Sequence, residues 1–127
     1  MTNKLPHDHG KHTEKILALI PSEAKFIEAA NLFKQLNAST RLRIWWILCH
    51  TEECGINIAS AVDMSPAAVA HHLRSLKLHG LITSRRDGKE VYYKLAETDL
   101  ADLIHQMIDS YFNMVCPTKR HYHQELR

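Results

Sequence analysis

The segment S65-P-A-A-V-A-H-H-L-R-S-L-K77 combines the period of an α-helix with residue types that suit nucleic acid. At 3.6 residues per turn, Val69, Leu73 and Leu76 form an apolar stripe that must face a core. The opposite face carries small residues beside an imidazole and a guanidinium: Ala67, Ala70, His71 and Arg74. Small side chains let a helix approach a DNA groove closely, and His and Arg can donate hydrogen bonds to base edges or phosphates. This face is therefore predicted to contact DNA.

Two further groups of residues near this segment have the chemistry to bind DNA phosphates. Ser65 is predicted to cap the helix and Pro66 to occupy its first position, where a missing N–H does no harm. The N–H groups of that helix end, together with Ser65, can hold a phosphate. A second group surrounds a tight Asp-Gly turn and is cationic: Arg85, Arg86 and Lys89. These cations are predicted to neutralise phosphates without selecting a sequence.

Five helices and one hairpin are predicted to position these side chains. The helices are expected at residues 22–36, 41–50, 56–62, 66–79 and 98–115, and two β-rich runs within 81–95 form a two-stranded hairpin. This order is that of a winged helix-turn-helix, a mainly α fold with a small β-hairpin. In that arrangement the fourth helix lies in the major groove, and the hairpin reaches the adjacent backbone or minor groove.

The boundaries of these elements also divide the chain. Residues 1–20 are predicted to form a flexible arm that contains histidines, residues 21–116 the DNA-binding and dimerisation domain, and residues 117–127 a C-terminal tail. Ser22 is predicted to cap the first helix, and Ser39 or Thr40 the second. The last helix has a broad apolar face that is expected to pack on another subunit: Leu100, Leu103, Ile104, Met107, Ile108, Tyr111 and Met114.

Composition limits the classes of protein to which the chain can belong. Its 127 residues are 45% hydrophobic, which is typical of a folded domain, and the net charge of +2 means that any basic site is local. No apolar run reaches the length of a membrane span, and the N-terminus lacks the order of a secretion signal, so a cytoplasmic location is expected. Three cysteines, an odd number, argue against a disulfide framework and favour free thiols. No catalytic triad order or phosphate loop is present, and the chain is predicted not to be an enzyme.

From about residue 30 to 115 the sequence resembles the ArsR/SmtB family of bacterial winged-helix repressors. The matching stretches are L32-F-K-Q-L-N-A-S-T-R-L-R43, M64-S-P-A-A-V-A-H-H-L-R-S-L-K77, G80-L-I-T-S-R-R-D-G-K-E-V-Y-Y-K94 and the final helix. The resemblance implies a homodimer, built through the first and last helices, that binds an inverted repeat in double-stranded operator DNA and releases it when an inducer binds. The two fourth helices of such a dimer should meet half-sites about 34 Å apart.

Members of this family sense metal ions or reactive sulfur and oxidants, and one usual metal site lies on the final helix. The positions that align with that site are Glu97, Asp99, Ser110 and Asn113. They offer oxygen alone, which suits zinc or cadmium poorly. The polar stripe of this helix, which includes Asp102, Gln106 and Asp109, is therefore expected to be solvated, and His105 lies off that stripe.

A second family location lies at the end of the second helix and is completed by the N-terminal arm. Here the chain has C49-H-T-E-E-C54, and the two thiols can converge only if the helix ends near His50. Relatives with a thiol-rich site often carry Cys-x-Cys, whereas this chain has Cys54-Gly55-Ile56. A mixed site for zinc or another transition metal as inducer is predicted from these ligands: Cys49, Cys54, Cys116, His7, His9 and His12.

The alternative is thiol chemistry. Some relatives that respond to persulfide carry one cysteine in the second helix and one near the end of the last, and Cys49 and Cys116 resemble that pair. The two sulfurs could be bridged on oxidation if their Cα atoms lie within disulfide range. His72, at the edge of the apolar stripe, is predicted to make a structural hydrogen bond instead of contacting a base.

Overall fold

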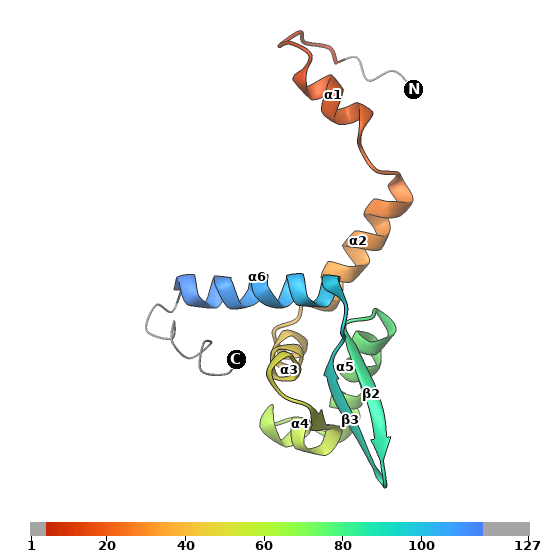
Figure 1. The fold of residues 1–127 in the computed structure, drawn as a ribbon, viewed down its shortest axis with the longest axis vertical. Coiled ribbons are helices and arrows are strands. Elements are labelled where there is room, and N and C mark those ends of the chain that lie inside the picture. Colours follow the sequence, from red (N-terminus) through yellow and green to blue (C-terminus); the bar gives the residue numbers. More distant parts are fainter. Residues whose placement is uncertain (1–4, 116–127) are drawn as a thin grey trace. The chain divides into compact units, whose positions relative to one another are not determined.

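The structure is a computed structural model that describes residues 5–115, and the chain divides into two compact units, Met1–Phe33 and Lys34–Arg127 (Figure 1). The first unit contains α1 (His12–Ala18) and most of α2 (Glu23–Gln35). Helix α1 lies in the segment predicted to be an arm, and the sequence did not predict it. The predicted cap of α2 is confirmed, because Ser22 Oγ accepts a hydrogen bond of 3.3 Å from the Lys25 amide.

The second unit has the element order of a winged helix-turn-helix. Its elements are α3 (Ser39–His50), β1 (Glu53–Cys54), α4 (Gly55–Ala61), α5 (Pro66–Leu78), β2 (Ile82–Asp87), β3 (Glu90–Leu95) and α6 (Asp99–Val115). Every predicted helix is present, and each begins and ends within a few residues of the prediction. In Figure 1 the hairpin of β2 and β3 extends beyond the helices as the wing, the name used here for residues 82–95.

The sheet has three strands, in the order β1-β3-β2 and fully antiparallel, where the sequence predicted a two-stranded hairpin. The additional strand, β1, has only two residues: Glu53 pairs with Tyr93, and Cys54 pairs with Tyr92. A two-residue strand is too short to show the alternation that identifies strands in a sequence. The wing is therefore joined to the segment that links α3 and α4.

Local signals determine where α5 begins and ends. Ser65 Oγ accepts a hydrogen bond of 3.1 Å from the Ala68 amide, and Pro66 opens the helix, as predicted. Gly80 follows the helix with φ = +72°, a left-handed conformation that glycine adopts without strain. At α3 the predicted cap is wrong: Ala38 precedes the helix and no side chain caps it, so Ser39 is its first residue.

The core of the second unit lies where α3, α4 and α5 meet the base of the wing and the start of α6. Its most deeply buried large side chains are Ile44, Trp45, Leu48, Ile58, Val69, Leu73, Leu76, Leu81 and Ile82. The indole of Trp45 donates a hydrogen bond of 3.1 Å to the Leu81 carbonyl, so its polar atom is satisfied inside the core. Among the described residues no helix is both long and apolar enough to cross a membrane.

Candidate nucleic-acid interface

Helix α5 presents one buried and one accessible face. Val69, Leu73 and Leu76 are at most 2% exposed and hold the helix on the core, as predicted. On the other side Ala67, His71 and Arg74 are exposed and Ala70 is half-buried. This accessible face has small side chains at its centre and hydrogen-bond donors at its edge, as close approach to a groove requires.

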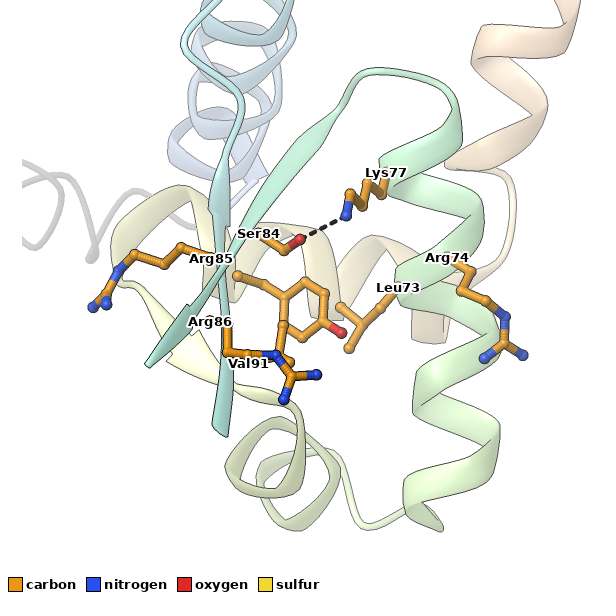
Figure 2. Close-up of a pocket in the computed structure, with 8 residues that line it drawn as sticks. Leu73, Arg74, Lys77, Ser84, Arg85, Arg86 and Val91 are labelled. Carbon is orange, nitrogen blue, oxygen red and sulfur yellow. Dashed lines mark hydrogen bonds between the residues drawn. The ribbon is translucent and has the colours of Figure 1, made fainter. Parts of the chain in front are cut away.

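A cleft of about 300 Å³ separates α5 from the wing. Basic residues from both elements line it, namely Arg74 and Lys77 from α5, and Arg85 and Arg86 from β2. Figure 2 shows Lys77 directed across the cleft to Ser84, a hydrogen bond of 2.7 Å between Nζ and Oγ, and the guanidinium of Arg86 close to Val91. Lys77 and Arg86 therefore bring positive charge into the cleft, whereas Figure 2 shows the guanidinium groups of Arg74 and Arg85 directed away from it. The whole-chain charge of +2 does not reveal this local basic surface.

Arg85 and Arg86 point to opposite sides of the wing, since successive strand residues alternate (Figure 2). Arg85 is held by Glu52 through two hydrogen bonds, of 3.0 Å from Nε and 2.8 Å from Nη2, and lies 4.8 Å over the Tyr92 ring. Hydrogen bonding from Arg85 lowers the pKa of the Glu52 carboxyl, and the same contact raises the pKa of Arg85. Arg85 therefore secures the wing to the residues that follow α3.

A polar network supports α5 from behind. Arg41 Nε donates to His72 Nδ1 at 3.1 Å, and Arg41 Nη1 donates to Gln35 Oε1 at 2.7 Å and to Ser75 Oγ at 3.0 Å. Ser75 also donates to Gln35, and the Nδ1 atom of His79 lies 2.9 Å from the Ser75 carbonyl oxygen. Burial, followed by the charge of Arg41, lowers the pKa of His72. The predicted structural role of His72 is thus confirmed by its contact.

The two described cysteines occupy protected positions. Cys49 is half-buried near the end of α3, and Cys54 is 5% exposed in β1. Burial, with smaller contributions from the charges of Asp109 and Asp102, strongly raises the pKa of the Cys49 thiol. A hydrogen bond from the Asn57 backbone lowers the pKa of Cys54, but burial and its contact with Glu90 outweigh this and raise it. Helix α3 ends at His50, as the predicted convergence of the two thiols requires.

The other ligands predicted from the sequence lie in separate parts of the chain. The rings of His7 and His9 stack with their centroids 5.9 Å apart, and His12 begins α1, all within the first unit. Cys116 lies outside the described residues. On α6, Asp99 and Ser110 are exposed, and Glu97 just before the helix pairs with Lys94 at 2.8 Å.

A group of possible metal ligands that the sequence did not predict lies between α3 and α6. Within residues 5–115, His50, His105 and Asp109 each offer one ligand atom, and these atoms lie within 4.8 Å of one another. Asp109 was expected to be solvated and is 5% exposed, so that expectation is wrong. The signal that could have identified it is its spacing, because His105 and Asp109 follow the buried residue Ala101 at intervals of four.

Comparison with known proteins places this architecture in a family. Residues 38–84 match the family model described as bacterial regulatory protein, arsR family. The chain is 33% identical over 101 residues to the transcriptional repressor SmtB homolog of Synechocystis sp., which covers 77% of this chain and 76% of that protein. It is 40% identical over 76 residues to the cadmium resistance transcriptional regulatory protein CadC of Listeria innocua, which covers 59% of this chain and 64% of that protein.

Solved structures give the same answer. A homodimeric winged helix-turn-helix DNA-binding domain from Mycobacterium bovis matches with a TM-score of 0.65 and 28% identity, over 75% of this chain and 91% of that one. Both the fold and these relatives are those of regulators that bind DNA, and the chain is accordingly not an enzyme. The accessible face of α5, the basic cleft beside it and the coverage of these relatives together show that the chain belongs to the ArsR/SmtB family of bacterial transcriptional regulators.

Proposed function

We propose that this chain is a homodimeric repressor that binds double-stranded operator DNA through α5 and the wing, and that a transition-metal ion of the zinc type releases it. The observation that carries the DNA-binding part is the accessible face of α5, which combines small residues with Arg74 and His71 and borders the basic cleft. An amphipathic helix on a protein-binding surface would have no need of small residues facing a cluster of cations.

The residues proposed to contact DNA divide by role. His71 and Arg74 donate to base edges, while Ala67 and Ala70 allow the helix to lie deep in the groove. The first turn of α5, with Ser65 and Pro66, receives a phosphate. The wing adds its own phosphate contacts from Arg85, Arg86 and Lys89. Because Arg85 is already paired with Glu52, Arg86 and Lys89 supply the larger part of the wing's contribution.

The proposed dimer rests on the outer face of α6. Leu100, Leu103, Met107 and Tyr111 are between 47% and 65% exposed in the single chain, and their side chains form one apolar stripe. The related domain from Mycobacterium bovis is homodimeric, which supports the same assembly here. Association through α2 and α6 would present two copies of α5 to the half-sites of an inverted repeat.

The proposed inducer is a metal ion because relatives of this chain are named for that response. CadC of Listeria innocua is a cadmium resistance regulator. The ligands proposed from the sequence are Cys49, Cys54, Cys116, His7, His9 and His12, a mixed nitrogen and sulfur set that suits zinc or cadmium. By linkage, a metal that weakens DNA binding about 100-fold is itself bound about 100-fold more weakly by the DNA complex.

The thiol alternative, in which Cys49 and Cys116 respond to reactive sulfur or oxidants, has less support. Thiolates, not thiols, attack sulfur and peroxides. The buried position of Cys49 raises its pKa and keeps it protonated. Metal sensing needs no reactive thiol in the free protein, because a bound ion itself displaces the proton.

DNA binding is tested by fluorescence anisotropy of the reduced, metal-stripped protein on duplexes from its own promoter across a range of salt concentrations. Arg74→Ala is expected to weaken specific binding by about 1–3 kcal/mol and to relax base preference at one position of each half-site. Lys89→Ala should reduce the salt dependence by about one unit of slope and affect all sequences alike. Lys25→Ala, an exposed lysine of α2, is the charge-matched control and should leave both quantities unchanged.

The metal response is tested in the same assay by adding zinc and then a chelator. Loss of operator affinity that the chelator restores supports a metal-released repressor. If zinc, cadmium, cobalt and nickel leave operator affinity unchanged but persulfide treatment abolishes it, the metal proposal is overturned in favour of a thiol response of Cys49 and Cys116. Binding with no dependence on salt or sequence would contradict the DNA-binding proposal itself.

A further inference from the structure

The end of α3 and the middle of α6 bring together three side chains that ordinarily bind metal ions. His50 is the last residue of α3, and His105 and Asp109 lie one turn apart on α6. The His105 Nε2 and Asp109 Oδ2 atoms are 2.6 Å apart, and His50 Nε2 lies 3.5 Å from Asp109 Oδ1. All three side chains are 6–11% exposed, so they face one another inside the unit.

The spacing of these atoms is close to what a small cation requires. A tetrahedral zinc ion with bonds of about 2.0–2.1 Å holds its ligand atoms about 3.4 Å apart. The three ligand atoms here lie within 4.8 Å of one another, and the imidazole rings of His50 and His105 meet edge to face with centroids 4.8 Å apart. Modest rotations of the side chains would bring all three onto one ion. Two imidazole nitrogens and one carboxylate oxygen form a donor set typical of zinc, with one position left for water.

Contacts from Trp46 hold the carboxylate of Asp109 and the ring of His50 in fixed positions, as is usual for metal ligands. The indole Nε1 of Trp46 donates a hydrogen bond of 3.1 Å to Asp109 Oδ1, which orients the carboxylate toward the two histidines. The ring of Trp46 packs on His50 with centroids 4.5 Å apart, so the imidazole is also positioned. Side chains that are fixed before binding lose little entropy when an ion arrives.

We propose that His50, His105 and Asp109 form a divalent transition-metal site within each subunit, distinct from the cysteine-containing ligand set predicted from the sequence. The site joins the two helices on which a signal would act. Helix α6 carries the proposed dimer face, and α3 leads through Glu52 to Arg85 of the wing. As a site of induction this proposal rests on the metal response proposed above, but ion binding can be measured without DNA.

The test uses the full chain, reduced and stripped of metal, titrated with Co²⁺ and then with Zn²⁺ in competition. Tetrahedral Co²⁺ absorbs visible light, and thiolate ligands add a charge-transfer band in the near ultraviolet. Three variants remove proposed ligands: His50→Gln, His105→Gln and Asp109→Asn. Asp102→Asn is the matched control, because it makes the same change at an exposed position of α6. Cys49→Ser/Cys54→Ser removes the rival ligands that the structure describes.

Cys49→Ser/Cys54→Ser is expected to bind one Co²⁺ per subunit with a visible spectrum and no thiolate band, and Asp102→Asn in that background should bind it equally tightly. Each ligand variant, made in the same background, should bind Co²⁺ at least about 100-fold more weakly, since loss of a direct ligand costs more than loss of an outer partner. Ligand variants that bind as tightly as Cys49→Ser/Cys54→Ser itself would overturn the proposal. So would the loss of all Co²⁺ binding in Cys49→Ser/Cys54→Ser.

A second readout needs no substitution and therefore does not depend on the folding of any variant. In the ¹⁵N-labelled wild type, Zn²⁺ should shift the ring nitrogens of His50 and His105, whereas shifts confined to His7, His9 and His12 would overturn the proposal. DNA anisotropy then separates the two hypotheses. Zinc that binds at the cluster without releasing DNA refutes metal induction and leaves the site intact. Zinc that still releases DNA from Asp109→Asn supports metal induction and refutes this site as its cause.

Discussion

His72 shows how a single contact in the network behind α5 makes stability depend on pH. Its Nδ1 atom accepts a hydrogen bond from Arg41, which requires an unprotonated ring nitrogen. Burial and the neighbouring positive charge lower the pKa of His72 below the value of about 6.5 that it has in the unfolded chain. The unfolded chain therefore binds a proton first as the pH falls.

Because the pKa of His72 is lower in the folded protein than in the unfolded chain, the free energy of unfolding should decrease as the pH falls from about 6.5 through the folded pKa. His72→Asn keeps a hydrogen-bond acceptor near Arg41 but does not titrate, and it should flatten this decrease. Urea unfolding of both proteins between about pH 8 and pH 5 measures the difference, because other titrating groups contribute equally to both curves. A variant with the same pH dependence as the wild type would show that His72 is not responsible.

The two described thiols give a prediction about reactivity. Because the pKa values of Cys49 and Cys54 are raised, both should be protonated near neutral pH. In the metal-free native protein, iodoacetamide should modify each at least about tenfold more slowly than in the urea-unfolded chain. Peptide mapping by mass spectrometry after timed quenching measures this ratio. Rapid native modification of Cys49 would instead favour the thiol alternative.

At the scale of elements, the contact between Glu52 and Arg85 decides how many cations the wing offers to DNA. Glu52 occupies the guanidinium with two hydrogen bonds. Glu52→Gln weakens this hold, so Arg85 becomes available to a phosphate. The variant is expected to bind operator DNA more tightly at low salt, with a salt slope steeper by about 0.9 for the added phosphate contact.

Anisotropy titrations at several salt concentrations measure that slope. Glu90→Gln is the control, because it removes an equal charge from the wing without releasing an arginine. Equal slopes for the two variants would mean that net charge, and not the release of Arg85, accounts for any change in affinity.

The elements also show which parts of the fold the sequence could predict. Ser65, Pro66 and Gly80 act on their own neighbours, so the limits of α5 follow from local chemistry. The strand β1 forms only because Glu53 and Cys54 meet Tyr93 and Tyr92, about forty residues away. A contact at that separation leaves no periodic pattern in the chain.

The same distinction explains what the sequence predicted of the functional surfaces. The accessible face of α5 was predictable because the period of one helix separates Arg74 from Leu73. The metal-ligand cluster was not, since His50 and Asp109 come from helices that are far apart in the chain. The sequence predicted that Asp109 is solvated with the rest of the polar stripe of the last helix, and only the packing of α6 on α3 shows it to be buried.

At the scale of the whole molecule, the exposed face of α6 predicts the oligomeric state. Leu103 is 65% exposed in the single chain, so Leu103→Glu should leave the fold of a subunit intact and destabilise the dimer by burying a charge in the interface. Leu78→Glu is the control, because Leu78 is 82% exposed at the end of α5.

Sedimentation velocity at micromolar concentration should show a dimer for the wild type and Leu78→Glu, and a monomer for Leu103→Glu. Operator affinity should fall with the dimer, because a single subunit reaches one half-site. A Leu103→Glu protein that sediments as a dimer would exclude this face as the interface.

The third strand of the sheet has a consequence for how any inducer could act. Pairing of β1 with β3, the Lys77–Ser84 hydrogen bond and the Glu52–Arg85 pair join the wing to the helix-turn-helix at three separate points. Because these contacts hold the wing and the helix-turn-helix together, the surface proposed to contact DNA has little freedom to change shape within one subunit. An inducer is therefore expected to act by changing the distance between the two α5 helices of the dimer, which must match about one turn of DNA.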